Sequence, residues 1–158
     1  MGYNVIDLID KAIKIEQERK NIIMNAMSKD SNYPNIRLIS KILVDQGDKR
    51  IDYYEKIKEE TKNKDLEEID FMTYDKISFL INEFNKKIYI TEAKSPKEYI
   101  LFSLELARDK YSLFIDIQGR LFNNTKDKNT KAYEILSKII EVVRKQIDTL
   151  EKTIQYIH

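Results

Sequence analysis

The chain contains no cysteine, and this absence excludes a disulfide framework, a thiolate nucleophile, and zinc or iron sites with cysteine ligands. Only three glycines and two prolines occur among its 158 residues, too few for the many turns of a β-sandwich. Its single histidine, His158, is the last residue of the sequence. Motifs that need histidine, such as a Ser-His-Asp triad or a zinc site, therefore have little support, and no glycine-rich phosphate loop occurs.

An excess of charge is also missing, because 28 lysines and arginines face 27 aspartates and glutamates. Binding to nucleic acid or anionic lipid by counterion release normally needs a basic excess, so we expect neither partner. No segment approaches the roughly 20 apolar residues of a membrane span. The first 20 residues carry acidic groups within their apolar stretch and no small-residue cleavage site, so we expect a cytoplasmic protein.

Long amphipathic stretches make up what remains, with 42% hydrophobic and 35% charged residues. Apolar residues recur every three or four positions from Asn4 to Met27, which predicts a helix, and Asn4 with Asp7 resembles a capping box at its start. Pro34 lies in a short polar break, after which a second apolar face continues to about Thr61. A short break favours an antiparallel helix hairpin.

A less regular stretch follows, and a second hairpin is predicted beyond it. The apolar residues from Ile77 to Ile88 indicate a shorter helix within this connection. Ser95, Pro96 and Glu98 form a strong helix start, with a serine cap, a proline at the first position and a glutamate at the third. This helix should end near Asn123 and Asn124, and the last helix carries an apolar stripe almost to the terminus.

These elements predict an all-α fold in a single domain, 1–158, built as an antiparallel four-helix bundle from two hairpins and a long crossover. The predicted boundaries are about 4–61 for the first hairpin, 62–94 for the crossover with its shorter helix, and 95–158 for the second hairpin.

The two hairpins resemble one another in sequence. Residues 8–16, which end in Glu16, match residues 101–109, and residues 43–50 match residues 139–146 at a nearly equal offset. Two similar offsets indicate a duplicated helix hairpin.

These repeated patterns resemble the rubrerythrin-like branch of the ferritin-like superfamily, whose hairpins read roughly A-I-x-x-E and L-A-x-x-E-x-x-H. The resemblance covers nearly the whole chain and implies a bundle with a long crossover. It also implies a di-iron or di-manganese site made by one glutamate from each of two helices and a Glu-x-x-His pair from each of the others.

The family's ligand positions are mostly occupied by residues that do not bind metal. In the first hairpin the glutamate corresponds to Glu16, and the Glu-x-x-His pair corresponds to Gly47 and Arg50. In the second hairpin the glutamate corresponds to Asp109, and the pair corresponds to Val143 and Gln146. We therefore expect no metal or other cofactor and a degenerate metal site.

Glu16 shares a helical face with Ile9 and Ala12, and Asp109 has the same position in the second hairpin, so both carboxylates should point inward and need a cationic partner. We expect Arg50 to supply the positive charge for Glu16 or Asp109, Gln146 to satisfy a remaining group, and Gly47 to leave room for the guanidinium. The alternative is a shifted register that leaves these groups solvated at the rim of the bundle.

Three functional hypotheses follow. The first is a non-catalytic structural, binding or regulatory module without catalytic residues, which forms a homodimer through an exposed apolar helix face. The second is a weakened rubrerythrin-like oxidoreductase that handles peroxide or iron and uses iron or manganese at Glu16 and Asp109. The third is a bundle that binds a small ligand in space opened by Gly47. The sequence does not identify the protein or small-molecule partner.

Overall fold

The protein is all-helical in the computed structural model, which describes residues 2–29, 34–87, 95–122 and 130–156. The helices are α1 (Val5–Lys29), α2 (Pro34–Thr61), α3 (Phe71–Asn85), α4 (Pro96–Leu121) and α5 (Lys131–Tyr156). Among the described residues the only β feature is an isolated antiparallel bridge between Tyr3 and Ile69. The all-α prediction is therefore confirmed.

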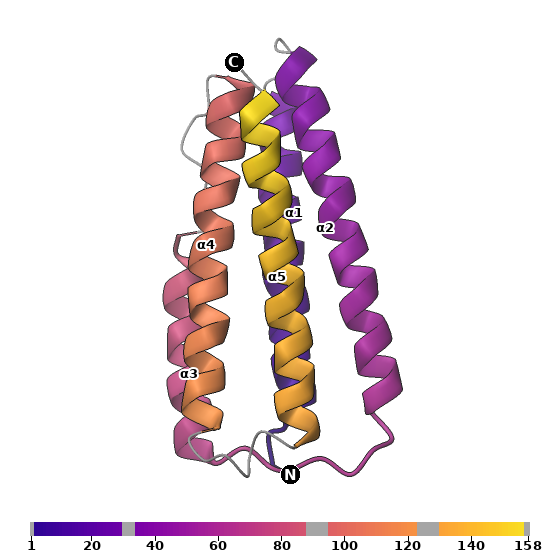
Figure 1. Ribbon diagram of the computed structural model, residues 1–158, viewed down its shortest axis with the longest axis vertical. Coiled ribbons are helices and arrows are strands. Elements are labelled where there is room, and N and C mark those ends of the chain that lie inside the picture. Colours follow the sequence, from indigo (N-terminus) through magenta and orange to yellow (C-terminus); the bar gives the residue numbers. More distant parts are fainter. Residues whose placement is uncertain (1, 30–33, 88–94, 123–129, 157–158) are drawn as a thin grey trace.

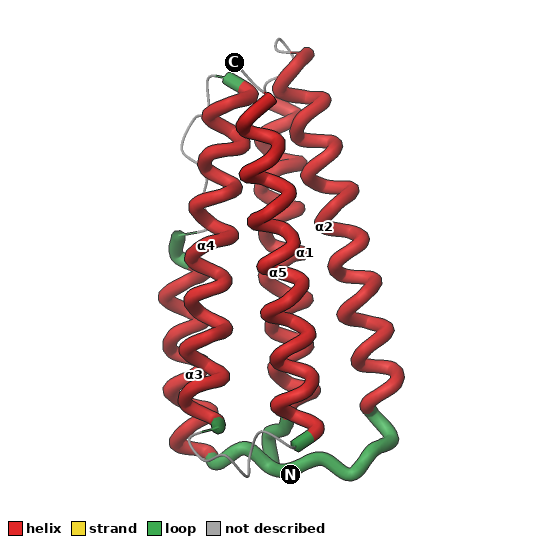
Figure 2. The backbone as a smooth tube through the Cα atoms, in the orientation of Figure 1, coloured by secondary structure: helices red, strands yellow, loops and turns green. Residues whose placement is uncertain are grey.

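Two helix hairpins form the bundle, α1 with α2 and α4 with α5, and these are the most extensively packed pairs. Figure 1 shows that α1 and α5 run upward while α2 and α4 run downward. The connection after α2 crosses the lower end of the bundle, and α3 then runs upward beside α4. Figure 2 shows this connection as an extended loop between the lower ends of α2 and α3.

The helix starts follow the capping signals of the sequence. The Asp7 carboxylate accepts a hydrogen bond from the Asn4 amide at 2.8 Å, and Asn4 Oδ1 accepts one from the Ile6 amide at 2.9 Å. At α4, Ser95 Oγ accepts a hydrogen bond from the Glu98 amide at 3.1 Å, and Pro96 is the first helical residue. Both predicted caps are confirmed, because each side chain satisfies backbone amides that have no partner within the helix.

The predicted boundaries agree with the helices to within a few residues where they can be compared. The first helix extends to Lys29 rather than Met27, and α4 ends at Leu121. The predicted ends at Asn123 and Asn124, the apolar residue Ile88 and the terminal His158 lie outside the described residues.

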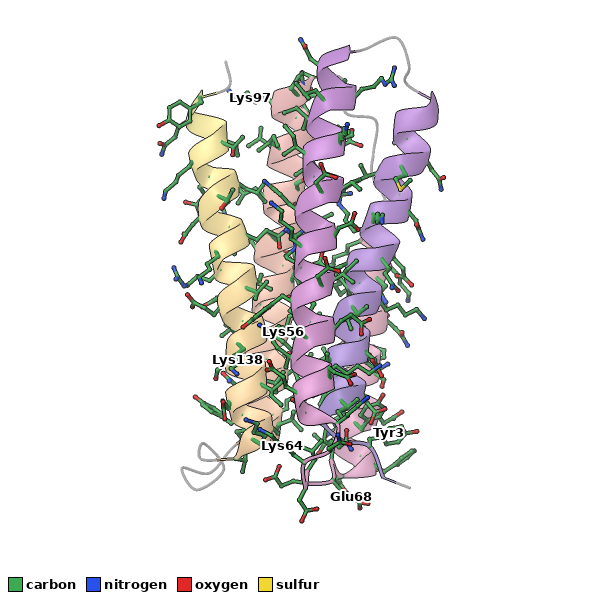
Figure 3. All side chains as sticks on the ribbon, turned by 90° about the vertical axis from the view of Figure 1, so that its right-hand side faces the viewer. Tyr3, Lys56, Lys64, Glu68, Lys97 and Lys138 are labelled. Atoms are coloured by element: carbon green, nitrogen blue, oxygen red, sulfur yellow. The ribbon has the colours of Figure 1, made fainter. Side chains whose placement is uncertain are left out.

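The connection between α2 and α3 is fixed to the start of α1. The Ile69 amide donates a hydrogen bond to the Tyr3 carbonyl at 2.7 Å, and the Tyr3 ring stacks on the Tyr74 ring with centroids 3.7 Å apart. Figure 3 shows Tyr3 and Glu68 at the same end of the bundle. Within the described segments, no helix is long and apolar enough to cross a membrane.

Candidate functional site

A polar layer divides the apolar core of the bundle into two parts. One apolar cluster reaches Ile15 on α1 and Val143 on α5, and the other begins at Ile23 on α1 and includes Leu150 on α5. The residues between them on α1 include Glu16, which is only 3% exposed. A buried carboxylate is costly without partners, so this layer is the natural place to look for a site.

Glu16 is held by two cations from two other helices. Arg50 on α2 donates from Nε to Glu16 Oε1 at 3.1 Å and from Nη2 to Oε2 at 3.2 Å, so the guanidinium binds the carboxylate in a bidentate manner. Lys110 on α4 donates from Nζ to Glu16 Oε1 at 2.6 Å. Burial alone would raise the pKa of the Glu16 carboxyl, but the positive charges and hydrogen bonds of Lys110 and Arg50 lower it to about 2.

Lys110 is itself buried, with 6% of its surface exposed. Burial lowers the pKa of its ammonium group, Glu16 raises it and Arg50 lowers it again, so that the pKa lies at about 8. Lys110 is therefore mostly protonated at neutral pH, although its pKa lies only about one unit higher.

The structure puts Lys110 where the sequence comparison places Asp109. Asp109 is half-buried and does not line the cavity beside Glu16, whereas Lys110 does. The expectation that Asp109 points inward is therefore wrong by one residue. Lys110 has a buried apolar residue at each position three or four residues away on α4, namely Leu106, Ala107, Leu113 and Phe114. Asp109 shares only two such neighbours, Leu106 and Leu113, because Glu105 and Ser112 are exposed.

Arg19 on α1 adds a further cation to this layer. Its Nη2 donates to Ser103 Oγ at 3.0 Å, and its guanidinium lies over the Phe102 ring, 5.2 Å from the centroid. Its Nη1 is buried and has no hydrogen-bond partner among the described residues. Burial lowers the pKa of Arg19 to about 10, so the guanidinium stays protonated at neutral pH.

The other positions singled out by the sequence lie in the same layer. Gly47 is buried and lines the cavity, and Val143 is fully buried in the apolar core. Gln146 lines the cavity too, but its Oε1 is buried without a partner among the described residues, and no hydrogen bond joins it to Glu16. A β-carbon added at Gly47 would lie 3.7 Å from Arg50 Nη2, which is an ordinary contact, so a methyl group would fit and glycine is not required to make room.

Two hollows meet at this layer. The inner one is a cavity of about 40 Å³ lined by residues of α1, α2, α3, α4 and α5. The outer one is a groove of about 590 Å³ between α2 and α5. Arg50 and Gln146 line both, so they form the boundary between the interior cavity and the groove.

The donor set does not fit a di-metal centre. The described parts of the chain contain no group of three or more histidine, cysteine, aspartate or glutamate side chains that could hold a metal ion. Glu16 already shares both of its oxygens with Arg50 and Lys110, and these cations would repel a metal ion.

The sequence contained signals for Lys110 and Arg19 that the family comparison did not use. All four residues at three- and four-residue spacing from Lys110 are apolar, and so are three of the four at that spacing from Arg19, but only two of the four for Asp109. A helical projection of each apolar face would have placed both cations inside the bundle.

Comparison with known proteins finds no family model, curated protein or solved structure that matches the chain. The resemblance to rubrerythrins stays a prediction from sequence motifs, as do the homodimer and the cytoplasmic location.

Proposed function

We propose that the chain is a ferritin-like bundle in which a fixed ion-pair cluster takes the place of a di-metal centre, and that it acts as a non-catalytic binding module. The observation that carries this proposal is the set of contacts around Glu16. Arg50 and Lys110 occupy both of its oxygens with hydrogen bonds of 2.6 to 3.2 Å.

The helix directions support the ferritin-like part of the proposal. In that architecture the first and second helices form one hairpin, and a crossover along the bundle leads to a second hairpin. Here α2 and α4 run in the same direction, and the segment that follows α2 crosses the lower end of the bundle and continues as α3 alongside α4 (Figure 1). The polar layer lies between the two apolar clusters, inside the bundle, as a di-metal centre does in that family.

The proposal that the protein is non-catalytic is based on the charge state of Glu16. Buried cations next to Glu16 stabilise the carboxylate as an anion, with a pKa of about 2, so it is a poor proton acceptor at neutral pH. The ion pairs also satisfy the carboxylate without a metal. A module of this kind would work by holding a ligand or partner rather than by transforming one.

Metal loading tests the proposal. The purified protein is incubated without oxygen with Fe(II) or Mn(II), passed over a desalting column and analysed for metal content. We expect much less than one metal ion per chain. When oxygen or hydrogen peroxide is then supplied as the oxidant, we expect no oxidation of Fe(II) and no consumption of peroxide above the rate without protein.

Two variants make the measurement specific. Glu16→Gln removes the buried carboxylate, and Glu151→Gln removes an exposed one on α5 that pairs with Arg108 at 3.5 Å. Stoichiometric metal that is lost in Glu16→Gln but kept in Glu151→Gln would overturn the proposal and favour the weakened oxidoreductase.

A further inference from the structure

The wall of the inner cavity carries more positive than negative charge. Arg19, Arg50 and Lys110 contribute three cations, and Glu16 is the acidic residue among the side chains that line the cavity. Lys20 also lines it, but its ammonium is paired with Asp48 at 2.8 Å. The described groups therefore leave two positive charges in the interior without an acidic counterpart.

Polar atoms with spare hydrogen-bonding capacity accompany this excess. Arg19 Nη1 is buried without a partner among the described residues, although Nη2 is engaged by Ser103. Gln146 Oε1 is also buried without a partner, and a half-turn of its amide would present NH₂ in the same place. Lys110 Nζ has three protons, and Glu16 accepts one of them.

The cavity has room for a small ion and shares part of its wall with a surface groove. One water needs roughly 10–15 Å³ by this measure, so a cavity of about 40 Å³ has room for about three or four non-hydrogen atoms. Arg50 and Gln146 form the shared wall with the groove between α2 and α5, so movement of these two side chains would admit an ion from the groove.

The groove walls are themselves basic. Lys49 and Arg50 on α2 and Lys138 and Lys145 on α5 line the groove, with Glu141 as an acidic residue among them. Lys138 is paired with Glu134 at 3.6 Å, which leaves Lys49, Arg50 and Lys145 as the main source of positive charge. Figure 3 labels Lys138 on α5. Glu141 is hydrogen-bonded to Arg144, so the groove should attract anions toward the cavity.

We propose that the inner cavity binds a small planar oxyanion, either a free ion such as formate or nitrate or the carboxylate head of a larger molecule. Arg19, Lys110 and Gln146 would donate hydrogen bonds to it, and it would enter from the α2–α5 groove. This inference rests on the proposed function, because it assigns a ligand class to the binding module.

Calorimetric titration with sodium formate and sodium nitrate tests the site, with chloride at constant concentration as the background anion because it is not an oxyanion. We expect saturable binding of one ion per chain and a rise in the unfolding temperature. Arg19→Gln removes one cation and keeps an amide donor for Ser103. It should weaken binding about tenfold or more, the effect of losing a charged hydrogen bond.

Arg108→Gln is the matched control, because Arg108 is an exposed cation on α4 two residues from Lys110 and does not line the cavity. It should leave the affinity unchanged. Equal weakening in both variants, or no saturable binding of either ion to the unmodified protein, would overturn the site.

NMR on the unmodified protein keeps the test independent of how the variants fold. Formate should shift the amide signals of Gly47 and Ala107, which line the cavity, and leave that of Gly119 unchanged, because Gly119 is exposed and does not line it. Shifts confined to exposed residues would contradict an interior site.

Acetate and hexanoate distinguish the two sources of the anion. The two share a carboxylate, but the chain of hexanoate could also lie in the groove. Tighter binding of hexanoate than of acetate supports the head of a larger molecule, and binding of the small ions alone supports a free ion. Absence of anion binding in a metal-free protein would refute this inference alone, whereas stoichiometric metal at Glu16 would refute the proposed function.

Discussion

Replacing Glu16 with glutamine should strongly destabilise the protein. The change keeps the size of the side chain but removes the negative charge that Arg50 and Lys110 contact. Breaking a buried ion pair by removing one partner costs about 3–5 kcal/mol, because the other charge is left buried and unpaired.

The two cations respond differently to this loss. Lys110 can avoid an unpaired charge by losing its proton, and because its pKa is already lowered to about 8, this costs only about 1.4 kcal/mol at neutral pH, at about 1.4 kcal/mol per pKa unit. Arg50 has no comparable route, because guanidinium groups are not deprotonated in proteins, and it would lose both of its contacts to a carboxylate. The loss should therefore lie between about 3 and 5 kcal/mol, with the larger share from Arg50.

Urea unfolding followed by circular dichroism measures the loss, with Glu151→Gln as an exposed control that should change the free energy of unfolding by less than about 0.5 kcal/mol. The double variant Glu16→Gln with Lys110→Met should recover part of the loss, because the unpaired cation is removed. A loss below about 1 kcal/mol in Glu16→Gln would refute the account of Glu16 as a fully paired buried anion.

Four further predictions concern pH and the helices. The free energy of unfolding should rise by up to about 3 kcal/mol between pH 8 and 10.5, because in this range Lys110 is protonated in the unfolded chain but loses its proton in the folded protein. The charged groups around Lys110 are Glu16, Arg19 and Arg50, and Lys110→Met should abolish this contribution. The free energy of unfolding should fall between pH 4.5 and about 2 through Glu16, since the unfolded carboxyl takes up its proton first, and pH-dependent urea unfolding measures both effects. Gly47→Ala should raise the midpoint of thermal unfolding, with a gain of up to about 1 kcal/mol, because the methyl group meets only an ordinary contact and alanine favours a helix; a loss would show that the cavity wall cannot accept it. Ser95→Ala should cost about 1 kcal/mol in urea unfolding by removing the acceptor of the Glu98 amide, and an unchanged midpoint would contradict that role.

The sequence predicted the helices well because local chemistry determines them. The break at Pro34 and the caps at Asn4 and Ser95 act within a few residues, so the pattern that predicts them is also their cause. The apolar spacing likewise places Val143 in the core.

The arrangement of charges across helices was harder to predict, because it depends on the rotation of each helix about its axis. Glu16 and Arg50 contact one another as expected. On α4 a difference of one residue, about 100° of rotation, separates Asp109 from Lys110 and reverses the charge that faces Glu16. Matching to the family motif favoured a carboxylate there, whereas the packing of α4 selected the lysine.

The hydrogen bond between Glu16 and Lys110 connects the two hairpins of the bundle, since Glu16 belongs to α1 and Lys110 to α4. Apolar faces built mainly from leucine and isoleucine can slide along one another, but sliding by one turn displaces a helix by about 5.4 Å. That displacement would separate the carboxylate from the ammonium and leave both charges in the apolar core. The ion pair therefore fixes the vertical alignment of the hairpins, and a chain with apolar residues at Glu16, Arg50 and Lys110 should show more than one alignment as extra NMR signals.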